Sequence, residues 1–303
     1  MLGISVAAKK QLLCSPDTLQ NYLLSLQGAR AAAEMCMMSF KKETPLANAA
    51  FWAARKGNLA LLQLLLNSGR VDVDCRDSTG TTALMVASYG GHTQCVRELV
   101  LHGADINLQR ESGATALFFA AQQGHDEIVK FLFEFGASTE FITRDGGTAL
   151  LAACQHGHAK VVETLLKNGA NIHDQLFDGA TSLFMAAQGG YVDVIRLLLT
   201  YGAKANQPRQ DGTSALFKAA AKGFSDVIEE LLKFSPTLGV LKNGSTALHA
   251  AVLGGSIKSV ALLLEAGANP SMRNKANELP ADLTQNERIL RLLKTSETKC
   301  IRP

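Results

Sequence analysis

Histidine and cysteine are the residues of this sequence with the greatest capacity for chemistry, because both can bind zinc. His156 and His158 are separated by one residue and form the pair most similar to a metal site. A second group has spacings that match no zinc pattern and comprises Cys75, His92, Cys95 and His102. We therefore expect no metal ion and no other cofactor.

Catalytic motifs are missing as well. The sequence holds no G-x-S-x-G elbow, no P-loop, no H-E-x-x-H helix and no G-x-G-x-x-G segment after a strand. We therefore expect that the chain is not an enzyme. An enzyme or regulatory subunit with unrecognised chemistry has no motif to support it.

Composition indicates a folded protein in a reducing compartment. Of the 303 residues, 47% are hydrophobic and only 19% are charged, and the net charge of +3 comes without a run of Lys and Arg. Nucleic acid is therefore not an expected partner. The six scattered cysteines predict reduced thiols and a location in the cytoplasm or the nucleus. No stretch reaches the roughly 20 apolar residues of a membrane helix, so direct membrane insertion is not expected.

The elements around these residues recur along the chain. Six segments share the pattern [T/S]-[A/S]-L-x-x-A-[A/S/C]-x-x-G, at 81–92, 114–125, 147–158, 180–191, 213–224 and 245–256. They close at Gly91, Gly124, Gly157, Gly190, Gly223 and Gly255, at intervals of 33, 33, 33, 33 and 32 residues. A weaker copy at 48–58 places Gly57 a further 34 residues upstream. Such a period indicates a stacked repeat protein.

Each copy continues into a second apolar pattern, as at 95–107 and 161–173. Apolar residues at i, i+1, i+4 and i+5 there predict one buried helix face. A glycine follows that suits a left-handed helix end, and then a D-G or N-G pair such as Asp145-Gly146 that suits a tight turn. One unit is therefore predicted to be a turn, a short alanine-rich helix, a glycine, a second helix and a glycine.

The combination of T-A-L-x-x-A-A-x-x-G-H with V-V-x-x-L-L-x-x-G-A resembles the ankyrin repeat family, and the resemblance covers roughly residues 45–283. It implies an all-α ankyrin repeat solenoid, built of helix-turn-helix units with loops similar to β-hairpins. It also implies a role as scaffold or adaptor. By the same resemblance, Asn107 and, more loosely, Asn206 are candidate substrates for an asparaginyl hydroxylase.

Several positions depart from the family pattern. The histidine of the family's T-P-L-H, which commonly ties one turn to the next repeat, survives only as His249. We expect more apolar contact at the equivalent positions, Met85, Phe118, Leu151, Phe184 and Phe217. The histidine after the closing glycine, as in His92 and His158, is expected to cap the second helix. Near Ser235-Pro236 the repeat is one residue short, which predicts an irregular turn.

Three regions follow from these patterns. Residues 1–38 do not fit the repeat and are expected to form a weakly ordered N-terminal extension. Residues 39–294 are expected to hold seven repeats and a degenerate C-terminal cap with a short final helix. Residues 295–303 are expected to be a flexible tail.

The hairpin tips and the exposed face of each first helix are free of the repeat's own requirements, and in this family they line a concave groove. The partner-binding residues predicted there are Tyr89, Gln122, Gln123, Arg144, Asp145, Gln155, His156, Phe177, Asp178, Gln188, Gln210, Asp211 and Lys222, with Glu111, Lys242 and Asn243 at further tips. The glutamines could form a ladder that hydrogen-bonds an extended peptide. The apolar tip residues Phe141, Ile142, Leu176 and Phe177 either pack between tips or form a partner patch.

Two functional hypotheses remain. In the first, the chain is a scaffold or adaptor that binds an unknown protein partner through the concave groove. In the second, it is an assembly or membrane-skeleton linker that uses the convex face or the N-terminal extension.

Overall fold

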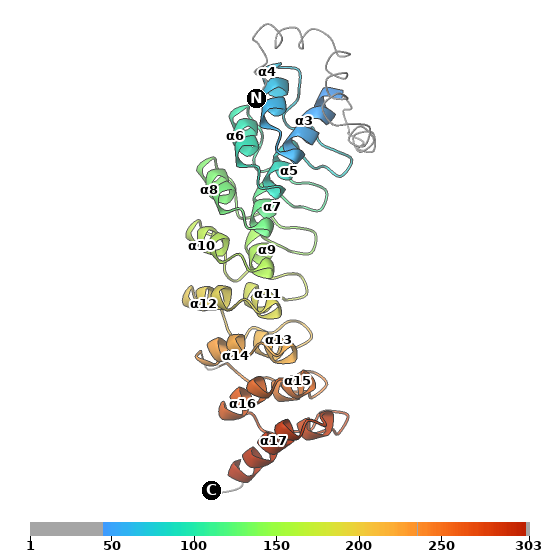
Figure 1. Cartoon of the computed structure of the whole chain (residues 1–303), viewed down its shortest axis with the longest axis vertical. Helices are drawn as coiled ribbons and strands as arrows, with labels where there is room; N and C mark the ends of the chain where they lie inside the picture. Colours follow the sequence, from blue (N-terminus) through green and yellow to red (C-terminus); the bar gives the residue numbers. More distant parts are fainter. Residues whose placement is uncertain (1–44, 235, 301–303) are drawn as a thin grey trace. The chain divides into compact units, whose positions relative to one another are not determined.

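The computed structural model describes residues 45–234 and 236–300 as pairs of short helices (Figure 1). The first helices of the pairs are α3 (Pro45–Lys56), α5 (Ala83–Tyr89), α7 (Ala116–Gln123), α9 (Ala149–His156), α11 (Ser182–Gly189), α13 (Ala215–Lys222) and α15 (Ala247–Leu253). The second helices are α4 (Leu59–Asn67), α6 (Thr93–Leu101), α8 (Asp126–Glu134), α10 (Ala159–Lys167), α12 (Val192–Thr200), α14 (Ser225–Leu232) and α16 (Ile257–Glu265). A 3-10 turn, η1 (Pro280–Leu283), and α17 (Glu287–Cys300) follow. The predicted all-α fold is confirmed, while the expected extension 1–38 lies outside the described residues.

The chain divides into two compact units, Met1–Phe119 with Glu134–Ala137 and Ala120–Phe133 with Ser138–Pro303. The 33-residue period continues through α7 and α8 without a break, so the sequence carries no sign of this division. In the first unit, α3 packs on α4 and α5, and α6 packs on α4 and α5.

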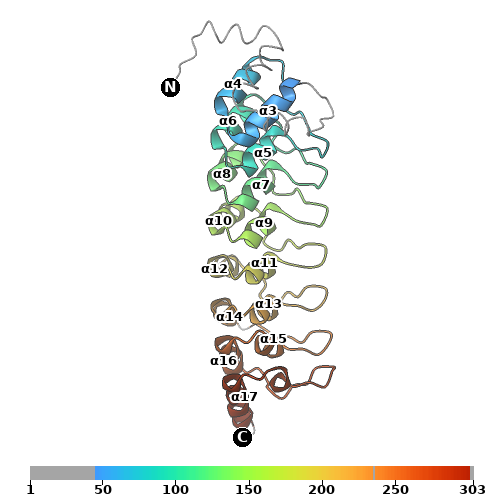
Figure 2. The same ribbon diagram turned by 45° about the vertical axis from the view of Figure 1, so that its right-hand side comes forward.

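The second unit is a stack of helix pairs. Its first helices α9, α11, α13 and α15 each pack on the next, and its second helices α10, α12, α14 and α16 do the same. Figure 2 shows these as two columns, with the hairpin loops extending beyond the column of first helices. Each repeat therefore contacts only its neighbours, as in other repeat proteins.

The sequence pattern explains each helix of the pair. In α9, Thr148 accepts a hydrogen bond from the Leu151 backbone N–H at 3.4 Å and caps the helix start. Small side chains such as Ala153, which is fully buried, allow α9 and α11 to pack closely. In α12 the buried residues are Val194, Ile195, Leu198 and Leu199. The predicted spacing of i, i+1, i+4 and i+5 is therefore confirmed.

The C-terminal end differs from its prediction. Helix α17 buries Ile289 and Leu293 and runs to Cys300, so residues 295–300 are helical where a flexible tail was expected. No glycine or proline follows Pro280 until Pro303, and so nothing in the sequence stops the helix earlier. The Thr295 hydroxyl also donates to the Arg291 carbonyl at 2.8 Å.

Among the described residues, Cys75, Cys95 and Cys154 are free thiols. Burial raises the pKa of Cys95 to about 11, with Glu98 adding to the effect. Burial also raises the pKa of Cys154, a residue of α9 with no accessible surface. Both behave as small apolar core residues. None of the described helices is long and apolar enough to cross a lipid bilayer.

Candidate functional site

The hairpin tips of the second unit share one backbone geometry. At the tip before α9, the Thr143 N–H donates to the Gly147 carbonyl at 2.8 Å, and the Gly146 N–H donates to the Thr143 carbonyl at 2.9 Å. The same two bonds recur at the tips before α11, α13 and α15. The side chains at the tips are therefore presented by closed, hydrogen-bonded turns.

Neighbouring tips are also bonded to each other. The Phe177 N–H donates to the Asp145 carbonyl at 2.9 Å, and the Gln210 N–H donates to the Asp178 carbonyl at 3.0 Å. The Gln210 side chain adds a bond to the Phe177 carbonyl at 2.7 Å. The predicted residues Asp145, Phe177, Asp178 and Gln210 are thus brought together in one row, which we call the tip ladder.

Phe177 is the aromatic residue of the tip ladder, and 64% of its surface is accessible. Its ring lies against the tip of the preceding repeat, because a Cβ built on Gly146 would be 3.1 Å from Phe177 Cδ1. Phe141 and Leu176 are half-buried, whereas Ile142 is exposed. Phe141 and Leu176 therefore fit packing between tips better than Phe177 does, and the partner patch remains a hypothesis for Phe177.

An arginine that the sequence analysis missed organises two of the predicted carboxylates. Arg209 forms ion pairs with Asp178 at 2.9 Å and with Asp211 at 3.7 Å, and it lies 5.6 Å from the centre of the Phe184 ring. The Thr213 backbone N–H, with Arg209 adding to it, holds the pKa of Asp211 below its ordinary value. In the first unit, Arg110 stands three residues before Gly113, as Arg209 does before Gly212, but it lies over Phe119 of its own repeat, whereas Arg209 lies over a ring of the preceding repeat. That shared position was the available signal.

The first helices of the second unit present a stripe of residues at i, i+3 and i+4, which lie on one helix face. This exposed stripe comprises Gln155 and His156 on α9, Met185, Gln188 and Gly189 on α11, Lys218, Ala221 and Lys222 on α13, and Leu253 and Gly254 at α15, of which Met185 and Lys218 are half-buried. Ala152 and Ala250, which hold the i position on α9 and α15, are buried. Gln155, His156, Gln188 and Lys222 are exposed, as predicted, and Arg144 is exposed at its tip.

The predicted glutamine ladder is only partly present. Gln155 and Gln188 occupy equivalent positions on α9 and α11, which pack directly on each other. Gln122 and Gln123 are half-buried at the end of α7. Beyond α11 the position is held by Ala221 and Leu253, so the amide character ends there.

The expected capping role of His158 is wrong. It stands at the start of α10 but makes no side-chain cap. Instead its Nε2–H donates to the Gln122 carbonyl at 3.0 Å, and its ring covers Gly124 of the preceding repeat. His92 reaches the Arg55 carbonyl in the same way in the first unit. These histidines connect repeats because the facing glycine leaves room for a ring.

Tyr191 and Phe224 continue this arrangement with aromatic rings. Tyr191 covers Gly157, and Phe224 covers Gly190. A ring on the facing glycine is therefore a recurring contact of the second unit.

Lowering the pH through about 6.5 is expected to destabilise the second unit through His158. Burial lowers the pKa of His158 from its ordinary value of 6.5, His156 and His125 add to this, and the Gln122 carbonyl opposes it. The unfolded chain therefore takes up the proton at a higher pH, and stability is lost as pH falls through 6.5. Urea denaturation at several pH values on either side of about 6.5 measures how the free energy of unfolding depends on pH. His158→Gln should flatten this dependence, and an unchanged slope would contradict the assignment.

His249 has the role that the family resemblance implied. Its Nδ1 accepts from the Thr246 backbone N–H at 3.2 Å, and its Nε2 donates to the Glu278 carbonyl of the next repeat at 3.2 Å. The equivalents Met85, Leu151 and Phe184 are buried, which agrees with the apolar junctions expected there.

Two other predicted features belong neither to the tip ladder nor to the first helices of the second unit. Tyr89, in the first unit, is 51% exposed and its ring meets Phe119 edge-on at 6.0 Å. Near the short repeat six, α14 ends at Leu232, and the Thr237 N–H donates to Asn206 Oδ1 at 2.7 Å. Ser235 itself lies outside the described residues, so the predicted irregular turn there stays a prediction.

The described residues hold no group of three or more His, Cys, Asp or Glu that could bind a metal ion. The rings of His156 and His158 are stacked with centroids 6.2 Å apart, and each donates to a backbone carbonyl, that of Ala152 or Gln122. Both rings thus hydrogen-bond to the backbone, while His156 remains exposed.

Known proteins with the same repeat pattern complete this description. The family model for ankyrin repeats (3 copies) matches residues 7–110, 50–141, 96–176, 136–209 and 183–274. The chain is 80% identical to human ankyrin repeat domain-containing protein 29, over 87% of this chain and 98% of that one, and 78% identical to its zebrafish (Danio rerio) counterpart, over 85% and 97%. The crystal structure of the human ASB11 ankyrin repeat domain superposes with a TM-score of 0.57 at 26% identity, covering 84% of this chain and 98% of that one. Ankyrin repeats are in general protein–protein interaction domains, and this chain belongs to the ankyrin repeat family.

Proposed function

We propose that the chain is a non-catalytic scaffold or adaptor that binds a protein partner through the tip ladder and the exposed stripe. The observation that carries the proposal is Phe177, an aromatic side chain 64% exposed on a row of tips held by backbone hydrogen bonds. Exposed aromatic residues on a rigid frame are typical of binding hot spots. The exposed amides of Gln155 and Gln188 on the first helices add donors and acceptors to the surface.

The second helices of the pairs fit this role less well. The carboxylates of α14 are engaged with cations of α12 and α16, so fewer of their charges are available to a partner.

The proposed partner set also includes an asparaginyl hydroxylase that acts on Asn107. The Asn107 side-chain amide donates to the Gly136 carbonyl at 3.0 Å, and this bond would have to open first.

Phe177→Asp combined with Gln155→Ala is expected to reduce partner capture at least about tenfold, because a hot-spot aromatic contributes about 2 kcal/mol or more. The full chain, fused to a proximity-labelling ligase in cells, gives the set of labelled proteins for each variant. The melting temperature should change by no more than about 2 °C, since both side chains are exposed.

Tyr201→Asp combined with Lys160→Ala is the matched control, because Lys160 is exposed on α10 and Tyr201 is exposed directly after α12, both in the column of second helices. It should keep the labelled set of the unaltered chain. If the Phe177 and Gln155 variant also keeps that set, the proposed surface is wrong.

A further inference from the structure

The sixth repeat, formed by α13 and α14, separates its charges between its two helices. Helix α14 carries three carboxylates, Asp226, Glu229 and Glu230, while α13 carries two lysines, Lys218 and Lys222, and no acid. On α13 the buried residues are Ala215, Leu216, Ala219 and Ala220. The lysines are four residues apart and therefore share the opposite face, the exposed stripe, where Lys222 is exposed and Lys218 is half-buried.

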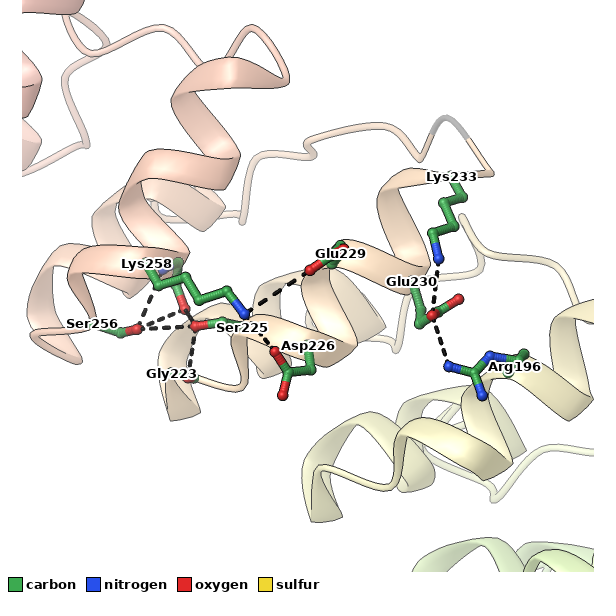
Figure 3. Close-up of polar contacts among 10 residues, drawn as sticks. Arg196, Gly223, Ser225, Asp226, Glu229, Glu230, Lys233, Ser256 and Lys258 are labelled. Carbon is green, nitrogen blue, oxygen red and sulfur yellow. Dashed lines mark hydrogen bonds and ion pairs between the residues drawn. The ribbon is translucent and has the colours of Figure 1, made fainter.

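The carboxylates of α14 form ion pairs within the column of second helices. Figure 3 shows Glu230 between Arg196 of α12 and Lys233, with both distances 2.9 Å. On the neighbouring side, Lys258 of α16 pairs with Asp226 at 2.6 Å and with Glu229 at 4.0 Å. None of these acids is shared with the lysines of α13.

The lysines of α13 have no such partner within the described residues. No ion pair of Lys218 or Lys222 is formed there, and α9, α11, α13 and α15 contain no Asp or Glu. Two like charges one turn apart repel each other along the helix, a cost that the fold does not offset. An external carboxylate placed between the two ammonium groups would relieve it.

An apolar side chain stands one repeat further along the stripe. Leu253, at the end of α15, is 68% exposed. This helix end lies directly beside α13, because a Cβ built on Gly254 would be 2.9 Å from the Ala221 carbonyl. On the other side of α13, Gln188 of α11 is exposed. The stripe thus presents an amide, a pair of ammonium groups and an apolar residue on three successive helices.

We propose that this part of the stripe binds an extended acidic segment of a partner protein. One carboxylate of the segment lies between Lys218 and Lys222, and an apolar side chain about three residues away contacts Leu253. The spacing follows because packed helices are about 8–10 Å apart, whereas an extended strand advances about 3.3 Å per residue. The inference rests on the proposed function and specifies the chemistry of the partner.

The test is a selection of random 12-residue peptides displayed on phage, a length chosen to span about four repeats of the stripe, against the immobilised full chain. The original chain is expected to enrich peptides with Asp or Glu about three positions from a large apolar residue. Lys218→Glu combined with Lys222→Glu should lose these peptides, and the affinity of a selected one should fall at least about 30-fold by fluorescence anisotropy. Leu253→Ser should weaken the same peptide, because the apolar contact is removed.

Lys160→Glu combined with Lys204→Glu changes the net charge equally at exposed positions off the stripe and should leave selection and affinity unchanged. The inference is overturned if no peptide is enriched, if the enriched peptides lack carboxylates, or if charge reversal on α13 leaves them bound. Self-association that disappears with charge reversal, measured by sedimentation, would assign the stripe to a second copy and overturn it as well. In each of these cases the cellular test with Phe177 and Gln155 still decides the proposed function separately.

Discussion

Leu165→Ala is expected to lower the free energy of unfolding of the second unit by about 2–5 kcal/mol, the range for a buried leucine whose cavity does not collapse. Leu165 lies in α10 and has no accessible surface. Helix α10 packs on α9 and α12, so the cavity is enclosed by three helices. Urea denaturation followed by circular dichroism measures the change.

Leu253→Ala is the matched control, because the same atoms are removed from a side chain that is 68% exposed. Its effect should stay within about 0.5 kcal/mol. Hydrogen exchange of the Leu165 variant should show faster opening in α9, α10 and α12 before more distant helices, since contacts are made between neighbours only. Equal losses for the two leucines would contradict the assigned core.

Gly157→Ala is expected to cost roughly 2–5 kcal/mol, from two separate causes. The φ angle of Gly157 is 78°, where a side chain costs about 1–2 kcal/mol. In addition, the new Cβ would lie 2.4 Å from Cδ1 of the Tyr191 ring, and such overpacking adds about 1–3 kcal/mol. Unfolding in urea gives the sum.

Gly169→Ala isolates the first cause. Gly169 has a φ of 88°, but a Cβ there meets no atom within 4 Å. It should therefore lose only about 1–2 kcal/mol. If Gly157 and Gly169 cost the same, the ring of Tyr191 moves freely and does not connect the repeats.

The fold could be predicted because its determinants are local and repeated. The spacing of apolar residues predicted the buried face of α12, and the threonines of the T-A-L motif stand where first helices begin. The sequence analysis began the flexible tail at residue 295, too early by six residues, because the degenerate cap has no motif that marks the end of its helix. The division into two units left no trace in the period.

The candidate site could be predicted by position but less well by contact. Gln155, Gln188 and Phe177 are exposed where the repeat predicts exposure. The ion pair of Arg209 with Asp178 was missed because it joins residues of different repeats, and the period alone does not show which side chains meet. His158 was misassigned for the same reason, since its partner carbonyl is 36 residues away.

The tip ladder also affects how the surface can change. Two of its bonds between repeats run from the backbone N–H of Phe177 and Gln210 to the carbonyls of Asp145 and Asp178, so these two do not depend on the side chains, whereas the added bond from the Gln210 amide does. New residues at these positions would therefore leave the main-chain frame intact. The same stack could be directed to a different partner by exchanging tip residues alone, and a library of variants randomised there should retain the fold in most of its members.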